Sequence, residues 1–268
     1  DIEEELTNFV GLLLGFAALA VGTGSGLARM GVAMPDVAAT AAAWHGPLMM
    51  CGFLGTVISL ERAVAIGRGW AYAGPLCAGL GGLAIVAGFV QFAPWLVLGA
   101  SVLLLAASLD IVARQRAMFT WTMAAGALSW AVGNALWSAG ASVPSVVAWW
   151  LAFLVLTIAG ERLELSRFLP PSAAARRTFG GIVGLVGAGL LTATWPWGQV
   201  LFGTGLVALA IWLLKQDVAR RTVRARGLTR FMAMCMLSGY AWLAIGGAIV
   251  VAAGGLVPGT ASYDAALH

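Results

Sequence analysis

The stretch PWLVLGASVLLLAASLDIVA, residues 94–113, carries a single charged side chain, Asp110. A helix needs about 20 consecutive, predominantly apolar residues to cross the hydrocarbon core of a bilayer. Inside that core the backbone polar groups of a segment must be satisfied within the segment itself, which favours a helix. The stretch therefore predicts a membrane-spanning helix and, with it, an all-α integral membrane protein.

Comparable apolar runs make up most of the remaining chain. Nine of them are long enough to be predicted as complete spans of one polytopic helical bundle. A tenth begins near Ala261 and reaches the end of the sequence at His268 before it could cross. The nine predicted spans are residues 7–28, 37–60, 71–92, 94–113, 118–140, 144–163, 179–195, 198–214 and 229–254.

The composition excludes several classes of protein. Of the 268 residues, 61% are apolar and 10% are charged, and the mean hydropathy is +0.93. A soluble domain usually carries about 25% charged residues. Soluble enzymes and secreted disulfide scaffolds are therefore excluded. The basic pI does not indicate a nucleic-acid partner, because the basic residues lie in short loops between apolar runs.

The basic residues predict the orientation in the membrane. Among the 15 Lys and Arg residues only Arg29 follows an odd-numbered span, and the others follow even-numbered spans. Because cytoplasmic loops carry the excess of positive charge, the N-terminus is expected to be cytoplasmic. The opposite loops are rich in Trp, as in an interfacial aromatic belt: Trp44, Trp95, Trp149, Trp150, Trp195 and Trp197.

A pattern G-x2-[LV]-x3-G-x3-P recurs three times, at the outer ends of spans 1, 5 and 9. It predicts parallel repeats of four helices with boundaries at residues 1–117, 118–225 and 226–268, the last one incomplete. The alternative is chance in a chain with 36 glycines. The three copies are Gly24-Leu27-Gly31-Pro35, Gly133-Leu136-Gly140-Pro144 and Gly247-Val250-Gly254-Pro258.

The only two histidines occupy the same place in two of these copies. His45 and His268 each lie ten residues after a repeat proline, whereas Leu154 takes that place in the second copy. Imidazoles at similar depth in a membrane indicate a shared ligand, and a haem iron can be bound from both sides by two of them. Alternatively, each could be hydrogen-bonded to a neighbouring helix, and His268 could begin an expression tag.

The residues around His45 suit a flat apolar cofactor. Pro47 should loosen the helix there. Gly46, Gly52 and Gly55 are expected to leave room. Arg29 could pair with a haem propionate or be an ordinary interfacial arginine. The apolar contact surface is assigned to Trp44, Met49, Met50 and Phe53.

Other polar residues have mainly structural interpretations. Asn134 should hydrogen-bond between helices. Glu61-Arg62 and Glu161-Arg162 end two spans, and each Arg is expected to extend to the lipid headgroups while the Glu pairs locally. The alternative is a proton entry point or two charged anchors that face each other. Asp110 before Arg114 and Asp217 before Arg220 are a weaker echo of the repeat. The six basic residues between Lys215 and Arg230 should contact anionic lipid headgroups, with a soluble partner as the alternative.

The segment Trp44-His45-Gly46-Pro47-Leu48-Met49 resembles the second-helix signature of the catalytic subunit of haem-copper oxidases, a His-Gly followed by Met. NnrS-like membrane haem proteins, which are associated with nitric oxide stress, are the suspected relatives within that group. The resemblance implies a b-type haem between helices 2 and 10, held by His45 and His268. It also implies a bacterial cytoplasmic membrane.

The chain departs from the oxidases at the copper site. Spans 6 and 7 contain no histidine, so no copper is expected and catalytic residues stay unassigned. Electron transfer or a response to a diatomic gas is then the expected function, with an oxidoreductase as the enzyme class if there is one. The expected partners are the lipid bilayer and a redox partner or larger membrane complex. The alternatives are a polytopic transporter and a cofactor-free structural subunit.

Overall fold

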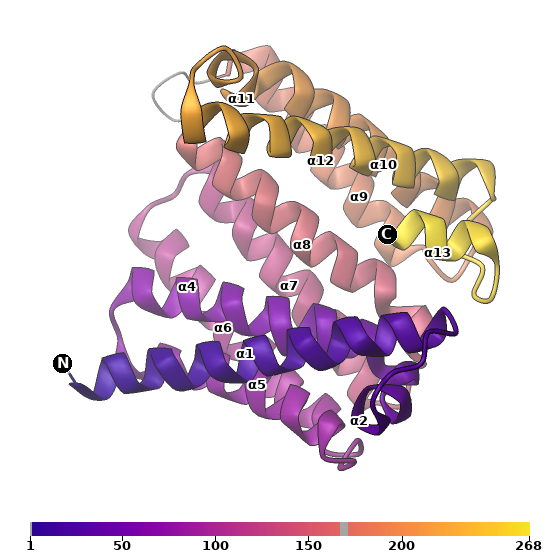
Figure 1. Ribbon diagram of the computed structural model, residues 1–268. Coiled ribbons are helices and arrows are strands. Elements are labelled where there is room, and N and C mark those ends of the chain that lie inside the picture. Colours follow the sequence, from indigo (N-terminus) through magenta and orange to yellow (C-terminus); the bar gives the residue numbers. More distant parts are fainter. Residues whose placement is uncertain (1, 167–170) are drawn as a thin grey trace. The chain divides into compact units, whose positions relative to one another are not determined.

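The computed structural model describes residues 2–166 and 171–268, with side chains from Asn8 onward, and all regular structure in these residues is helical. The predicted all-α fold is therefore confirmed (Figure 1). The helices are α1 Ile2–Arg29, α2 Asp36–Thr40, η1 Ala42–Trp44, α3 His45–Pro47, η2 Leu48–Gly55, α4 Thr56–Ile66, η3 Gly69–Tyr72, α5 Ala73–Val86, α6 Ala93–Arg114, α7 Met118–Ser138, α8 Val143–Leu165, α9 Ala173–Leu191, α10 Pro196–Gln216, α11 Ala219–Thr222, α12 Gly227–Ala252 and α13 Ala261–Leu267.

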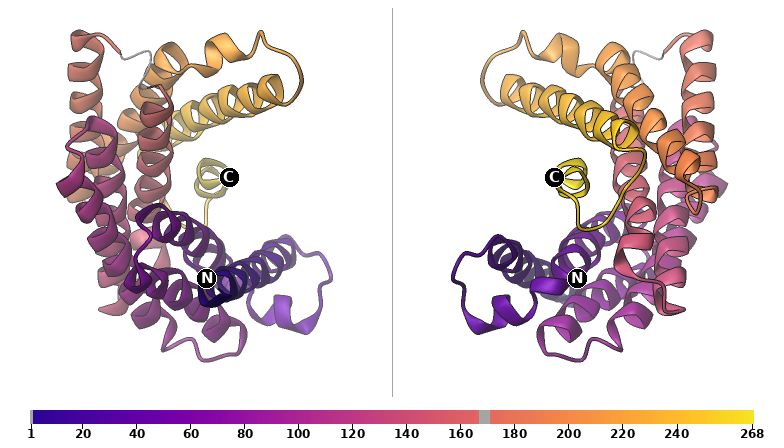
Figure 2. Two further views of the ribbon diagram at one scale, coloured as in Figure 1. Left: turned by 90° about the vertical axis from the view of Figure 1, so that its left-hand side faces the viewer. Right: turned by 90° about the vertical axis from the view of Figure 1, so that its right-hand side faces the viewer.

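The chain divides into two compact units, Asp1–Thr157 (unit 1) and Ile158–His268 (unit 2), and each is described by itself. In unit 1, α6 packs against α5 and α7, and α1 packs against η2 and α5. In unit 2, α10 packs against α9 and α12, and α13 packs against α12 (Figure 2). The unit boundary coincides with neither predicted repeat boundary, so the repeats stay a prediction. Arg167 lies outside the described residues.

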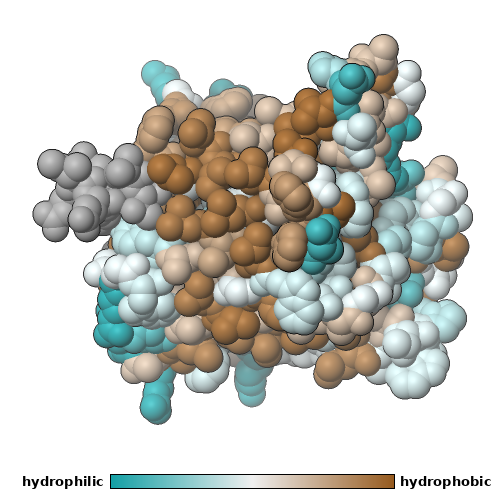
Figure 3. Space-filling model, turned by 90° about the horizontal axis from the view of Figure 1, so that it is seen from below, coloured by the Kyte–Doolittle hydropathy of each residue, from teal (hydrophilic) through white to brown (hydrophobic). Residues whose placement is uncertain are grey.

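Seven helical segments among the described residues are long and apolar enough to cross a membrane, which suggests a membrane protein. Large apolar side chains remain exposed along them, and Figure 3 shows a broad apolar area on one face. Two predicted spans form helices, α7 and α9, but are not among the seven. α7 contains Thr, Ser and Asn, and α9 carries Arg176 and Arg177 near its N-terminus. The seven are Asn8–Arg29, Ala42–Ile66, Gly69–Val86, Ala93–Arg114, Val143–Leu165, Pro196–Gln216 and Gly227–Ala252.

Glycine pairs bring helix backbones into direct contact in both units. A Cβ on Gly52 of η2 would lie 3.2 Å from the Cα of Gly82 in α5. A Cβ on Gly203 of α10 would lie 2.9 Å from the carbonyl oxygen of Gly247 in α12. Small residues let helices approach closely in lipid, where the hydrophobic effect does not hold them together.

The recurring glycine–proline pattern ends three helices in the same way. Gly31, Gly140 and Gly254 have φ of 84°, 96° and 73°, a left-handed conformation that glycine adopts without steric cost. In each copy the residue after this glycine donates its N–H to the carbonyl of the Leu or Val of the pattern, which is a Schellman cap. Gly88 ends α5 with the same kind of cap, although no proline follows it at the spacing of the repeat. The three hydrogen bonds are Val32 to Leu27 at 3.1 Å, Ala141 to Leu136 at 3.0 Å and Gly255 to Val250 at 2.9 Å.

The core of unit 1 is built on aromatic side chains from α7 and α8. The rings of Trp130 and Phe153 stack with centroids 4.8 Å apart. Trp150 is fully buried and donates its indole N–H to Oδ1 of Asn134 at 2.9 Å, while Cys51 Sγ lies 3.7 Å from the same oxygen. The expected hydrogen bonding of Asn134 between helices is confirmed. Trp150 belongs to the core rather than to an interfacial belt, because its N–H has a buried acceptor.

Candidate functional site

His45 lies where a predicted span is interrupted. The segment Ala42–Ile66 passes from a 3₁₀ turn through the short α3 into a π-helix at Leu48–Gly55. Pro47 has no N–H to donate and directly precedes this π-helix. The predicted loosening of the helix near His45 is confirmed, and π-helical turns inside α-helices occur frequently at functional sites.

The His45 ring is held against α1 by a hydrogen bond and by a glycine. Its Nδ1 lies 2.7 Å from the carbonyl oxygen of Gly22, which can only accept, so Nδ1 carries the proton. A Cβ on Gly26 would lie 2.9 Å from Cε1 of the ring. In the tautomer fixed by this hydrogen bond, Nε2 is the nitrogen with the lone pair.

The residues assigned to a cofactor surface have partners within unit 1. The sulfur of Met49 lies 2.9 Å from the position of a Cβ on Gly22. Phe53 packs against Phe16 with ring centroids 6.1 Å apart. Trp44 is half-buried, and Arg29 is exposed at the end of α1, three residues after Gly26.

Two glycines that were expected to leave room for a cofactor accept protein atoms instead. Ala18 and Gly82 occupy the space beside Gly52. The indole of Trp130 occupies the space beside Gly55, where a Cβ would lie 2.4 Å from Cζ2. Beside Gly46 the nearest atom, of Val143, is 3.8 Å away from a Cβ position. Of the three glycines, only Gly46 lies beside space that no neighbouring atom fills closely.

His268 follows α13 in unit 2. Its Nδ1 lies 2.9 Å from the carbonyl oxygen of Asp264, one turn back, so the same tautomer is favoured as at His45. α13 packs on α12 where a Cβ on Gly246 would lie 3.0 Å from the carbonyl oxygen of Ala266. Within the residues that the structure describes, no three His, Cys, Asp or Glu side chains gather into a metal-binding group.

Unit 2 contains a buried polar cluster that the sequence did not reveal. Arg162 donates two hydrogen bonds to the carboxylate of Asp217, from Nε to Oδ2 at 2.7 Å and from Nη2 to Oδ1 at 2.8 Å. The Tyr240 hydroxyl donates to the same Oδ2, and the Ala219 N–H donates to Oδ1 at 2.8 Å. The cluster thereby ties together α8, the start of α11 and α12.

The cluster holds a carboxylate in its charged form away from water. The Asp217 side chain is 0% exposed and that of Arg162 is 15% exposed. Burial by itself raises the pKa of a carboxyl group, but the hydrogen bonds from Arg162, Tyr240 and the Ala219 N–H, together with the Arg162 charge, outweigh it. The pKa of Asp217 therefore lies below its ordinary value.

The two Asp–Arg pairs that weakly echo the repeat differ in their contacts, and Asp217 does not bind Arg220. Arg220 donates to the carbonyl oxygen of Lys215 at 2.7 Å, whereas the echo's other member, Asp110, does bind Arg114 at 2.5 Å. Asp217 directly follows an apolar span, where an acidic residue is rare and favours a cationic partner. The cation is Arg162, which lies 55 residues before Asp217 in the sequence and reaches it only through helix packing.

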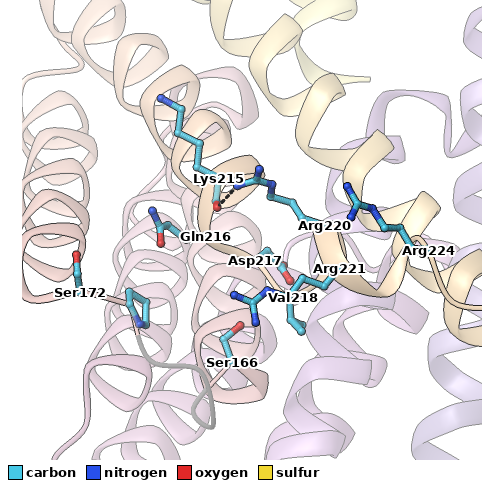
Figure 4. A pocket seen from close by; sticks show the side chains of 10 residues that line it. Ser166, Ser172, Lys215, Gln216, Asp217, Val218, Arg220, Arg221 and Arg224 are labelled. Carbon is cyan, nitrogen blue, oxygen red and sulfur yellow. Dashed lines mark hydrogen bonds between the residues drawn. The ribbon is translucent and has the colours of Figure 1, made fainter.

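A cavity of about 680 Å³ opens beside this cluster, and four of the described residues that line it are cations (Figure 4). Its lining comes from the ends of α8 and α10, the residues before α9, and the segment leading to α12. The lining residues are Ser166, Pro171, Ser172, Lys215, Gln216, Asp217, Val218, Arg220, Arg221 and Arg224.

The second Glu-Arg pair that was expected to end a span, Glu61-Arg62, lies in unit 1. Glu61 is exposed, and Arg62 donates from Nη2 to the sulfur of Met123 at 2.9 Å. Arg62 Nε is buried without a hydrogen-bond partner. Arg62 thus connects α4 to α7, which differs from the expectation that its side chain extends to the lipid headgroups.

Comparison with known proteins identifies a family. A family model described as "Domain of unknown function (DUF8744)" matches residues 8–268. No curated protein and no solved structure matches the chain.

Proposed function

The chain belongs to the DUF8744 family, and we propose that it is a membrane-embedded haem protein in which His45 and His268 bind one iron. The observation that carries the proposal is the hydrogen bond from His45 Nδ1 to the carbonyl oxygen of Gly22 at 2.7 Å. Metal-binding histidines almost always donate their other ring N–H to a carbonyl, carboxylate or water, which fixes the tautomer and orients the ring. His268 has the equivalent arrangement with Asp264.

The neighbouring residues support the same cofactor. Arg29 is exposed beyond Gly26, on which the His45 ring packs, and its guanidinium would bind a propionate in bidentate fashion. Trp44, Met49 and Phe53 are half-buried and would supply apolar contact surface. Of Gly46, Gly52 and Gly55, only Gly46 would admit a Cβ without displacing a neighbouring atom.

A b-type haem supplies one-electron chemistry, and the protein controls it through its axial ligands and their hydrogen bonds. If His45 and His268 both bound the iron, no position would be left for nitric oxide or another diatomic gas, so electron transfer would be favoured. No copper site is proposed, because Leu154 stands at the histidine position of the second repeat.

The proposed topology has nine crossings with a cytoplasmic N-terminus in the cytoplasmic membrane of a bacterium. The resemblance to NnrS-like proteins and oxidase subunits supports it. So does the charge asymmetry of the loops, in which Arg29 is the single basic residue on the outer side. The crossings then include α7, whose Ser129 and Asn134 are buried, and α9, whose exposed Arg176 and Arg177 would lie at the membrane surface.

A visible spectrum of the purified chain tests the haem. The reduced protein should show the paired bands of low-spin haem, and His45→Ala or His268→Ala should each abolish them. Added imidazole should restore the bands in His45→Ala, because the missing ligand is supplied from solution. Leu154→Ala alters the matching position of the second repeat and should leave the spectrum unchanged.

Absence of haem absorbance after incubation with haemin would refute the proposal. If the chain instead co-purified with a stoichiometric membrane partner, a cofactor-free structural subunit would be the better assignment. Bands that survive both histidine substitutions would show that other ligands bind the iron.

A transporter is the second candidate, and the interruption of Ala42–Ile66 favours it. Discontinuous membrane helices line substrate sites in many transporters, and η2 is such an interruption. Substrate-dependent uptake into vesicles that contain only this protein would establish this function. A colourless protein with such uptake would replace the haem proposal.

A further inference from the structure

The cavity beside Asp217 has an excess of positive charge that the described residues do not neutralise. Lys215, Arg220, Arg221 and Arg224 line it, and among the described residues none of the four forms an ion pair with a carboxylate. All four are exposed. Four cations around one opening attract an anion strongly, because their fields add within a concave surface.

Asp217, the one carboxylate among the described residues that line the cavity, already has partners. Asp217 accepts hydrogen bonds from Arg162, Tyr240 and the Ala219 N–H, and its side chain is fully buried. Its negative charge is therefore compensated by Arg162, and it does not neutralise the exposed cations. Its structural effect is to fix the turn after α10 from which Arg220 and Arg221 project.

One of the cations is held in place by the helix that it follows. Arg220 donates from Nη1 to the carbonyl oxygen of Lys215 at 2.7 Å, which caps the last turn of α10. This contact uses one N–H of a guanidinium that has five, and the others are left to face a ligand. Figure 4 shows this contact as the dashed line.

Neutral donors among the lining residues suit the oxygens of a phosphate. Ser166 and Ser172 contribute hydroxyl groups, and Gln216 contributes a side-chain amide. Ser172 is the N-cap of the 19-residue helix α9, accepting from the Ala175 N–H at 3.2 Å. The positive end of the α9 dipole therefore lies at the same cavity and adds to the attraction for an anion.

We propose that this cavity binds a phosphate group through Arg220, Arg221, Arg224 and Lys215. Guanidinium groups match phosphate in bidentate geometry, and a volume of about 680 Å³ exceeds that of a single phosphate. The cavity lies at the ends of α8 and α10, which are both candidate spans, where lipid headgroups would be. The phosphate of an anionic phospholipid is the expected source, and free inorganic phosphate has the same chemistry.

Binding to the purified full chain in neutral detergent tests the site, with the shift in melting temperature as readout. One arm titrates phosphatidylglycerol against phosphatidylcholine, and the other titrates inorganic phosphate against chloride at constant ionic strength. Arg220→Gln with Arg221→Gln should weaken the apparent affinity by about 30-fold. Arg176→Gln with Arg177→Gln removes the same charge from α9 outside the cavity and should leave the affinity within about twofold.

A saturable shift with phosphatidylglycerol identifies a lipid headgroup, and one with inorganic phosphate alone identifies a soluble anion. Either result supports the site if the two double variants differ as stated. Equal losses in both double variants would show binding to net charge and would overturn the proposal. The absence of a saturable shift in both arms would overturn it as well.

Discussion

At the scale of single residues, the glycines of this chain serve two physically different purposes. Gly26 gives space to the His45 ring, and Gly55 gives space to the Trp130 indole. Gly31 and Gly140 instead allow a left-handed backbone at a helix end, with no atom within 4 Å of a Cβ position. Substitution should therefore fail for steric reasons at the first pair and for conformational reasons at the second.

Gly55→Ala should lower the stability of unit 1. The new methyl would lie 2.4 Å from Trp130 Cζ2, and the stacked Trp130 cannot move without disturbing Phe153. Overpacking of this kind costs about 1–3 kcal/mol. Thermal unfolding in detergent would measure the loss. Gly180→Ala in α9 is the control, since no atom lies within 4 Å, and a gain of up to about 1 kcal/mol is expected from helix propensity. Equal melting temperatures would contradict the close packing.

At the scale of elements, one ionic cluster determines how α8, α11 and α12 meet. Asp217 follows α10 in an extended conformation, with ψ of 143°, and accepts from Arg162 and Tyr240. Removing one partner of a buried pair leaves the other charge uncompensated, which is costlier than losing an exposed pair. Asp110 is the natural comparison, because its side chain is 23% exposed beside Arg114.

Asp217→Asn should destabilise unit 2 by about 3 kcal/mol, because it leaves the Arg162 cation without a counter-charge. Asp110→Asn should cost at most about 1 kcal/mol. Tyr240→Phe removes one hydrogen bond and should cost about 1–2 kcal/mol. Melting temperatures of the three variants in detergent test this ranking, and a larger loss for Asp110→Asn than for Asp217→Asn would refute it.

The same cluster predicts a pH dependence. The pKa of Asp217 is lowered in the folded protein, mainly because the hydrogen bonds from Arg162 and Tyr240 outweigh the effect of burial. Its contribution to stability is therefore fully present above the unfolded value of about 3.9 and is lost as the pH falls through the lower folded value. The stability difference between wild type and Asp217→Asn should stay constant from pH 7 to about pH 5 and shrink below about pH 4. A difference that shrinks near neutral pH would contradict this assignment.

At the scale of the whole molecule, the proposed topology assigns every loop to one side of the membrane. Nine crossings place residue 33 and residue 194 outside and residue 172 inside. If α9 did not cross, residues 172 and 194 would lie on the same side. The number of crossings can therefore be tested by the sidedness of these residues, independently of the haem spectrum.

Single cysteines in a chain without Cys51, Cys77 and Cys235 would measure this. Ala33→Cys and Thr194→Cys should react with a membrane-impermeant maleimide from outside intact cells. Ser172→Cys should react only after the membrane is permeabilised. All three positions are exposed, so a lack of labelling reflects sidedness rather than burial. Labelling of Ser172→Cys and Thr194→Cys from the same side would rule out nine crossings.

Features that depend on the local chain were readable from the sequence. Apolar runs of about 20 residues predict helices because the backbone must satisfy its own hydrogen bonds in lipid. Pro47 predicted the altered helix at Leu48–Gly55, and the recurring Gly and Leu or Val positions correspond to the Schellman caps. These features involve interactions over a few residues only.

Partner choices between distant residues were decided by the tertiary structure alone. Asp217 binds Arg162 rather than Arg220, Trp130 fills the space beside Gly55, and Trp150 is buried on Asn134. A sequence gives the type and spacing of these side chains but not which helix faces meet. Close packing of whole helices selects the partners, because the space beside a glycine is filled by whichever neighbouring helix packs against it.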